Sequence, residues 1–267
     1  MPSLLCSSNY SLDSKILRKA AQSIGWETLR LDGNTIPEWF SPPDSKVALF
    51  FTAPKAFSIA KQLGLSLAGC SPDWTVNLPP ELLNRQMKQQ RLKDAVAISD
   101  PQFVKHAVSK AFDADVYDQK TLADATKTIH PDSLVHIAEP VVWNCEFRCF
   151  VSHSNIETAS VYRYQGVPVP DYDSFPEISE SQMAEVYEFA NSVLHHPDVK
   201  CPDAFVLDVG IIENRGWSVV ECNECWACGI YDCDPASVLE TLASASAPSD
   251  IISPDWDFER HYNAACP

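Results

Sequence analysis

Residues 219–233, VVECNECWACGIYDC, bring together the side chains of this chain that are best suited to chemistry. Four cysteines lie at positions 222, 225, 228 and 233, and two of the gaps between them are the two-residue gaps that zinc sites use. The same stretch places Glu221 and Asn223 two residues apart. Carboxylate and amide oxygens are ligands that Mg²⁺ prefers. The segment therefore suggests two kinds of metal site, one of thiolates and one of oxygens.

The sequence before this segment predicts how the oxygen ligands are oriented. VLDVGIIENRGWSVVECN, residues 206–223, predicts an antiparallel hairpin that turns at residues 213–216. If the turn is symmetric about the 214–215 bond, Asp208 lies opposite Glu221 and on the same face as Asn223, because side chains alternate faces. Opposed Cβ atoms are about 5 Å apart, which suits two carboxylates that share a cation. The alternative is that both carboxylates are solvated positions on a half-exposed strand.

The cysteines fit an iron–sulfur site less well. A bacterial ferredoxin-type run ends with a three-residue gap, a cysteine and a proline. Here the last gap has four residues, and Asp234 precedes Pro235. Six more cysteines lie at 6, 70, 145, 149, 201 and 266, so the chain uses cysteine freely at small apolar positions. A zinc site made by the four clustered cysteines stays open as a second interpretation.

Cations accompany the carboxylates along the chain. Lys105 lies in the middle of an apolar strand, FVKHAV, where an unpaired ammonium would be costly to bury, and Lys110 follows at a turn. In NCEFRCFV, Glu146 and Arg148 share one face of a predicted strand, and the apolar residues between them share the other. A snorkelling lysine and a weak surface Glu–Arg pair are the alternatives.

Composition limits the partners. The chain has 267 residues, 45% of them hydrophobic, and a formal net charge of −16, so it can bury a core but lacks the basic stripe that nucleic acid requires. No apolar run approaches the ~20 residues of a membrane-spanning helix, and MPSLLCSSNY lacks the features of a signal peptide. We therefore expect a cytoplasmic protein with reduced thiols and with no nucleic-acid or membrane partner.

The predicted elements change in character along the chain. Strands alternate with helices over the first 75 residues, which predicts a small parallel α/β layer. Residues 81–95 are expected to be helical, QFVKHAV and ADVYD to be paired strands, and CEFRCFVSH and ETASVYRYQG to form a second hairpin. The fold class is therefore α/β followed by α+β, divided into residues 1–75, 76–137 and 138–267.

The order of these features resembles the ATP-grasp superfamily of carboxylate–amine ligases. Lys105 in a strand, AEPVVWNCEFR, Arg163, Asp208 and then ECN follow one another in that order. The similarity is closest to short amidoligase-type members related to ribosomal-protein glutamate ligases, and it covers roughly residues 75–235. It implies two α+β lobes that sandwich ATP, preceded by a small parallel α/β domain.

The resemblance also implies a role for each matching residue. Phosphate contacts are expected from Lys105 and Lys110, and contacts with adenine and ribose from Glu139, Pro140, Val141 and Glu146. Arg148 and Arg163 would stabilise the transferring phosphoryl group or the substrate carboxylate. Asp208, Glu221 and Asn223 would hold one or two Mg²⁺ ions, and these are the residues that the hairpin itself selects.

The implied reaction joins a carboxylate to an amine through an acylphosphate, with ATP as the phosphoryl donor. The expected partners are a small-molecule or peptide carboxylate and an amine acceptor, with specificity in CSSNY and YQGVPVPDYD. KHAVSKAF lacks the glycine-rich lid of many family members. A nucleotide-binding module without ligase activity is therefore one alternative, and a protein with cysteine-ligated zinc or iron–sulfur is the other.

Overall fold

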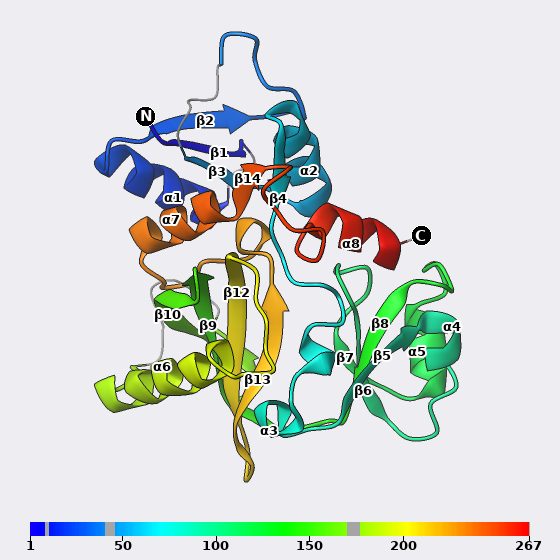
Figure 1. Ribbon diagram of the computed structural model, residues 1–267. Coiled ribbons are helices and arrows are strands. Elements are labelled where there is room, and N and C mark those ends of the chain that lie inside the picture. Colours follow the sequence, from blue (N-terminus) through cyan, green and yellow to red (C-terminus); the bar gives the residue numbers. More distant parts are fainter. Residues whose placement is uncertain (9–10, 41–45, 170–176, 267) are drawn as a thin grey trace.

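The computed structural model describes residues 1–8, 11–40, 46–169 and 177–266, so CSSNY and YQGVPVPDYD lie in part outside the described residues. Three larger β-sheets and one two-stranded ladder account for the strands in this part of the chain. Figure 1 shows the first sheet at the top of the molecule, with the other two below it, side by side.

The first sheet belongs to an N-terminal layer, residues 1–67. Its strands β1 (Ser3–Ser7), β2 (Glu27–Leu31) and β3 (Val47–Phe50) pair in parallel in the order β2-β1-β3. Helices α1 (Leu12–Ser23) and α2 (Ala53–Gln62) connect them to one another and to β4 (Leu65–Leu67). Leu4, Leu5 and Cys6 are wholly buried, as expected for a parallel strand covered on both faces. The predicted parallel α/β layer is confirmed.

The second sheet has four antiparallel strands. They are β5 (Met87–Arg91), β6 (Gln102–His106), β7 (Asp115–Tyr117) and β8 (Leu134–Ala138), in the order β5-β8-β6-β7. Short helices α3 (Pro80–Leu83) and α4 (Leu92–Ala95) flank β5, and α5 (Gln119–Ala125) precedes β8. The predicted helix over residues 81–95 is therefore wrong. Strand β5, MKQQR, shows no apolar alternation, and its pairing with β8 fixes a backbone that its composition does not reveal.

The third sheet is antiparallel and has five strands. They are β9 (Trp143–Ser152), β10 (Asn155–Tyr164), β11 (Val167–Pro168), β12 (Ala204–Ile212) and β13 (Gly216–Asn223), in the order β11-β10-β9-β12-β13. Helix α6 (Glu180–Leu194) covers one face, where Phe147 and Cys149 pack against Val186 and Ala190. The alternation predicted for β9 is thereby confirmed, and its opposite face is left for polar side chains.

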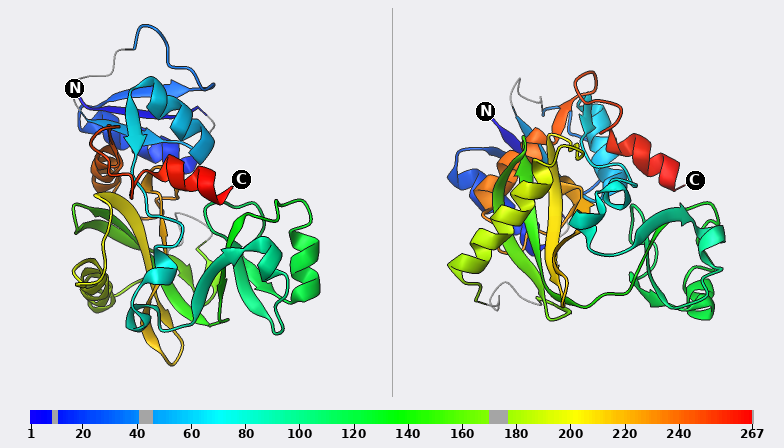
Figure 2. Two further views of the ribbon diagram at one scale, coloured as in Figure 1. Left: turned by 45° about the vertical axis from the view of Figure 1, so that its right-hand side comes forward. Right: turned by 60° about the horizontal axis from the view of Figure 1, so that its bottom comes forward.

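The C-terminal segment returns to the N-terminal layer. The 3₁₀ helices η1 (Thr75–Asn77) and η2 (Cys225–Ala227) precede β5 and follow β13, and the chain ends with α7 (Pro235–Ser244), β14 (Ser246–Pro248) and α8 (Phe258–Ala265). Helix α7 contacts α1, β3 and β9, and β14 pairs with β4 (Figures 1 and 2). Phe258, 1% exposed, packs against Trp226 and Phe57. One hydrophobic core thus joins the N-terminal layer to the five-stranded sheet.

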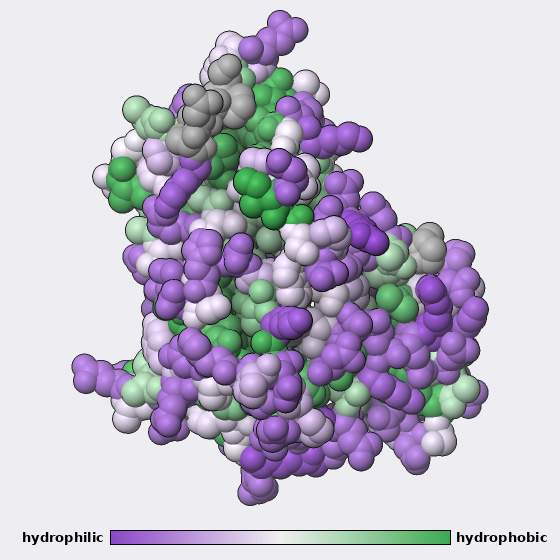
Figure 3. Space-filling model, viewed as in Figure 1, coloured by the Kyte–Doolittle hydropathy of each residue, from purple (hydrophilic) through white to green (hydrophobic). Residues whose placement is uncertain are grey.

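The surface matches the acidic, polar composition. On the face drawn in Figure 3, hydrophilic residues predominate over the four-stranded sheet at the right. No helix in the described part of the chain is both long enough and apolar enough to cross a bilayer.

Candidate active site

A row of four charged side chains, the charged row, runs across three strands of the five-stranded sheet and onto the four-stranded sheet. Arg148 on β9 lies opposite Asp208 on β12, which lies opposite Glu221 on β13. Arg148 Nε and Nη2 donate to Asp208 Oδ1 and Oδ2 at 2.9 and 2.7 Å. Lys105 on β6 donates to Glu221 Oε2 from the other sheet. The two cations and two carboxylates balance in charge, at the place where the two sheets meet.

Asn223 links the two carboxylates of the charged row. Its Nδ2 donates to Asp208 Oδ2 at 2.8 Å and to Glu221 Oε1 at 2.9 Å. Asp208 is wholly buried. The three residues that the hairpin predicted as metal ligands therefore converge on one point. Two carboxylates and an amide are hard oxygen donors, and a cation would stabilise the buried charge of Asp208, so the set fits Mg²⁺.

The hairpin reaches this arrangement by a different route from the predicted one. Ile212 pairs with Gly216, so the turn is one residue shorter than predicted. A β-bulge between Val219 and Glu221 then adds one residue to β13, and Asp208 faces Glu221 after all. The predicted turn is wrong, whereas the predicted pairing of Asp208 with Glu221 is confirmed.

Arg85, which the sequence did not single out, contacts the bulge. It donates to the carbonyl oxygens of Val219 and Val220 at 2.6 and 2.8 Å and to Ser218 Oγ at 3.0 Å. Its guanidinium lies 5.1 Å from the centre of the Trp143 ring. Burial lowers the pKa of Arg85 to about 10, against the opposing effect of nearby carboxylates. Arg85 immediately precedes the unpredicted strand β5, so no pattern in the sequence marked it.

Burial and charge pairing act in opposite directions on the charged row. Burial acts to raise the pKa of Glu221, but the Lys105 charge and the hydrogen bonds from Lys105 and Asn223 bring it down to about 2. Burial raises the pKa of Asp208, and the ion pair with Arg148 opposes that rise. Burial acts to lower the pKa of Arg148, but Asp208 raises it well above its ordinary value. The bidentate geometry keeps the Arg148–Asp208 pair charged.

Glu146 forms a second charged group, two residues before Arg148 on β9. It accepts a hydrogen bond from Tyr162 Oη at 2.6 Å, and its Oε1 lies 3.2 Å from Arg163 Nε. A β-bulge between Val161 and Arg163 lets two consecutive residues of β10 reach Glu146. Burial raises the pKa of Glu146, while the bonds from Tyr162 and Arg163 lower it. The structure thus brings predicted residues Glu146 and Arg163 together near Arg148.

The predicted hinge, Glu139-Pro140-Val141, connects β8 to β9 and therefore links the two sheets. Glu139 Oε1 lies 2.5 Å from Arg215 Nη2, in the β12–β13 turn. The hydrogen bond from Arg215, with one from the Gln86 backbone, lowers the pKa of Glu139 to about 2. Lys110, in contrast, is exposed on the loop between β6 and β7, outside the charged row.

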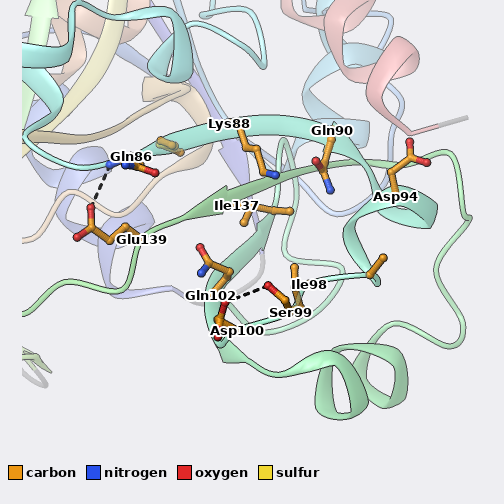
Figure 4. Close-up of a pocket in the computed structure, with 12 residues that line it drawn as sticks. Gln86, Lys88, Gln90, Asp94, Ile98, Ser99, Asp100, Gln102, Ile137 and Glu139 are labelled. Carbon is orange, nitrogen blue, oxygen red and sulfur yellow. Dashed lines mark hydrogen bonds between the residues drawn. The ribbon is translucent and has the colours of Figure 1, made fainter.

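A hollow of about 450 Å³ lies beside the hinge (Figure 4). Lys88, Ile137 and Gln102 line it, and Glu139 lies at its edge. Ile137 on β8 is adjacent to the residue that pairs with Lys105, so its side chain points to the opposite face of the sheet. The hollow is therefore separate from the charged row.

The clustered cysteines contact different partners. Cys222 Sγ lies 3.7 Å from Thr75 Oγ1, and Cys233 Sγ lies 3.2 Å from Ser160 Oγ. Cys228 contacts the carbonyl oxygen of Cys225. Among residues 1–8, 11–40, 46–169 and 177–266, no three His, Cys, Asp or Glu side chains surround a common metal position. The described geometry supports packing for these thiols and offers no cysteine-ligated zinc or iron–sulfur site.

Comparison with known proteins agrees with this geometry. The fold and site define an ATP-grasp protein, an ATP-dependent carbon–nitrogen ligase of the predicted class. Residues 82–241 match the model of an ATP-grasp domain, the second family of its clade, and the chain belongs to this family. The predicted superfamily and fold are thereby confirmed.

Solved structures share the fold at low sequence identity. The crystal structure of D-cycloserine synthetase DcsG has a TM-score of 0.58 and 13% identity, over 91% of this chain and 99% of that chain. A RimK domain ATP-grasp protein from Sphaerobacter thermophilus DSM 20745 has a TM-score of 0.49 and 11% identity, over 91% and 98%. The ATP-grasp ligase PsnB with its minimal precursor has a TM-score of 0.49 and 12% identity, over 90% and 98%. A sequence search of curated proteins finds no match.

Proposed function

We propose that the protein is an ATP- and Mg²⁺-dependent carboxylate–amine ligase that forms an amide bond through an acylphosphate. The observation that carries this proposal is the charged row, in which Arg148, Asp208, Glu221 and Lys105 meet between two sheets with Asn223 joining the carboxylates. This arrangement offers cations for phosphoryl oxygens and oxygen ligands for a metal within one site.

Asp208, Glu221 and Asn223 would hold one or two Mg²⁺ ions, because their side chains converge and hard oxygen donors suit this ion. Bound Mg²⁺ supplies charge neutralisation to the phosphate oxygens of ATP. The hinge Glu139-Pro140-Val141 would lie beside adenine, since it joins the two sheets next to the charged row. Glu146, buried near Arg148, would receive the ribose hydroxyls.

The residues of this chain would act mainly by positioning and by charge. In the first step, a substrate carboxylate oxygen attacks the γ-phosphorus and the bond to the β–γ bridging oxygen breaks, releasing ADP. In the second step, the amine nitrogen attacks the acyl carbon and loses a proton, and phosphate leaves. Lys105, Arg148 and Arg163 would bind the anionic oxygens, with Lys110 reaching the phosphates from its loop. Phosphoryl transfer needs little else from a protein.

The proposed substrates are a small-molecule or peptide carboxylate and a separate amine, in keeping with the family resemblance. A cytoplasmic location follows from the expectation of reduced thiols. A nucleotide-binding module without ligase activity is the second candidate. It is favoured by residues 105–112, which follow the phosphate lysine without any glycine.

Trapping with hydroxylamine tests the proposal. Hydroxylamine attacks an acylphosphate to give a hydroxamate and phosphate, so it reports the first step without knowledge of the natural amine. The protein is incubated with Mg·ATP, hydroxylamine and pools of amino acids, hydroxy acids, dicarboxylic acids and dipeptides. We expect one pool to give hydroxamate and ADP in equal amounts, and Lys105→Met to abolish both. Binding of Mg·ATP without acid-dependent ADP release from any pool would contradict ligase activity and support the second candidate.

A further inference from the structure

Asp13 lies in the first turn of α1 in the N-terminal layer, but its carboxyl group does not cap the helix. Ser11 is the N-cap residue, and its side chain accepts a hydrogen bond from the Ser14 backbone N–H. Asp13 instead reaches residues 229–231, the loop that follows η2. Its Oδ2 lies 3.7 Å from the point where a Cβ on Gly229 would be, and the backbone N–H of Ile230 donates to its carboxyl group.

The Asp13 carboxylate is incompletely satisfied. Its Oδ1 is wholly buried and accepts no hydrogen bond from any described residue. No described Lys, Arg or His side chain lies within ion-pair distance of it. Burial raises the pKa of Asp13, while the Ile230 N–H and the more distant charge of Arg148 lower it. A buried carboxylate without a cation is costly, and a bound ammonium group would remove that cost.

The same loop touches the residue proposed to act on the substrate carboxylate. Arg148 Nη1 donates to the Gly229 carbonyl oxygen at 3.0 Å, and the Arg148 guanidinium carbon lies 5.1 Å from the centre of the Tyr231 ring. Tyr231 has a φ of +49°, a left-handed conformation that is uncommon for a bulky residue and is often found at functional sites. Gly229 therefore has Arg148 on its carbonyl side and Asp13 on its Cα side.

We propose that Asp13 binds the protonated amino group of the acid that this ligase activates, so that the carboxylate substrate is an amino acid or a peptide with a nearby free amine. This inference rests on the proposed ligase function. Arg148 would face the carboxylate end of such a zwitterion, and Asp13 would face its ammonium end. The N-terminal layer would thus select the substrate, while the two larger sheets bind the nucleotide.

Matched acid pairs test this assignment. The hydroxamate assay is run with alanine and propionate, aspartate and succinate, glutamate and glutarate, and lysine and 6-aminohexanoate, which differ only in the α-amino group. We compare wild type with Asp13→Asn, which keeps an acceptor for the Ile230 N–H and removes the charge. Asp232→Asn is the control, because it makes the same change at an exposed position next to Tyr231.

The expected result is that the wild type uses an amino acid at least tenfold better than its deaminated partner. Asp13→Asn should lower kcat/KM for that amino acid by about tenfold to a hundredfold, the range for a hydrogen bond to a charged group. It should leave the deaminated acid and the Kd for Mg·ATP within about twofold, and Asp232→Asn should behave as wild type. A purely structural role would change both acids of a pair alike.

Two outcomes would overturn the assignment: equal use of both acids by the wild type, or equal loss of both in Asp13→Asn. If none of these acids reacts while Mg·ATP binds, the ligase proposal is contradicted for this substrate class. The melting-temperature rise that the same acid pairs produce in wild type and Asp13→Asn then decides the role of Asp13 independently. An amino-acid-specific rise that disappears in Asp13→Asn supports it, and no such rise refutes it.

Discussion

Arg85→Met should disrupt the candidate site without touching any residue of the charged row. The substitution keeps an apolar stem against Trp143 and removes the donors to the Val219 and Val220 carbonyls. Each unsatisfied carbonyl inside the sheet costs about 1–3 kcal/mol, so the free energy of unfolding should fall by about 2–5 kcal/mol. This is a large share of the roughly 5–15 kcal/mol that stabilises a typical domain.

The bulge makes this prediction specific to the site. Without the extra residue in β13, the register of Ile212 with Gly216 would continue, and Val220 would face Asp208. Glu221 would then turn to the opposite face of the sheet, because side chains alternate with a period of two. We therefore expect Arg85→Met to lose Mg²⁺-dependent nucleotide binding at temperatures where it is still folded.

Urea denaturation and Mg²⁺ titration at fixed ATP measure both effects. Arg91→Met is the matched control, because the Arg91 guanidinium also bonds to a backbone carbonyl, that of Asp132, but at an exposed position. It should cost less than about 1 kcal/mol. An Arg85→Met protein within about 1 kcal/mol of wild type, with unchanged Mg²⁺ dependence, would refute the role given to Arg85.

Three further predictions concern the frame around the site. Burial and then the Lys105 charge lower the pKa of His136 to about 4, so acid favours the unfolded chain as pH falls from 6.5 to 4; wild type should lose about 3 kcal/mol over that range, and His136→Gln less, as urea melts at several pH values will show. Asp208→Asn alone should cost about 3–5 kcal/mol because it strands Arg148, whereas the double change Asp208→Leu with Arg148→Met should recover part of that loss in a double-mutant cycle; equal losses would show that the pair is not coupled. Phe258→Ala should cost about 3–5 kcal/mol by calorimetry, since α8 fills the core of the N-terminal layer, and a cost below about 1 kcal/mol would show that the C-terminal segment is dispensable.

Period-two alternation accounts for what the sequence could predict. In β9 it assigned the apolar residues to the α6 face and Glu146 and Arg148 to the other, because that strand is long and one of its faces is core. In the β12–β13 hairpin it found Asp208 opposite Glu221, although the predicted turn was one residue too long. The bulge compensated for that error, and no rule of alternation predicts a bulge.

The remainder depends on contacts between distant parts of the chain. Strand β5 is polar throughout, so its extended backbone is set by pairing with β8. Arg85 bonds to carbonyls more than 130 positions away, and Asp13 reaches a loop more than 200 positions away. The return of α7 and α8 to the N-terminal layer places the 229–231 loop against α1. Neither contact follows from local pattern, because each is fixed by how the sheets pack together.

The central claim is that Asp208, Glu221 and Asn223 hold the metal of a bound nucleotide. Thermal melts with and without Mg·ATP test it in wild type, Glu221→Gln and the matched control Glu213→Gln, whose side chain is exposed in the turn of the same hairpin. Nucleotide at about 100 times its Kd should add roughly 2.7 kcal/mol of stability, a rise of several degrees. We predict this rise in wild type and Glu213→Gln only when Mg²⁺ is present, and its loss in Glu221→Gln. An equal Mg²⁺-dependent rise in Glu221→Gln, or no rise in wild type, would contradict the claim.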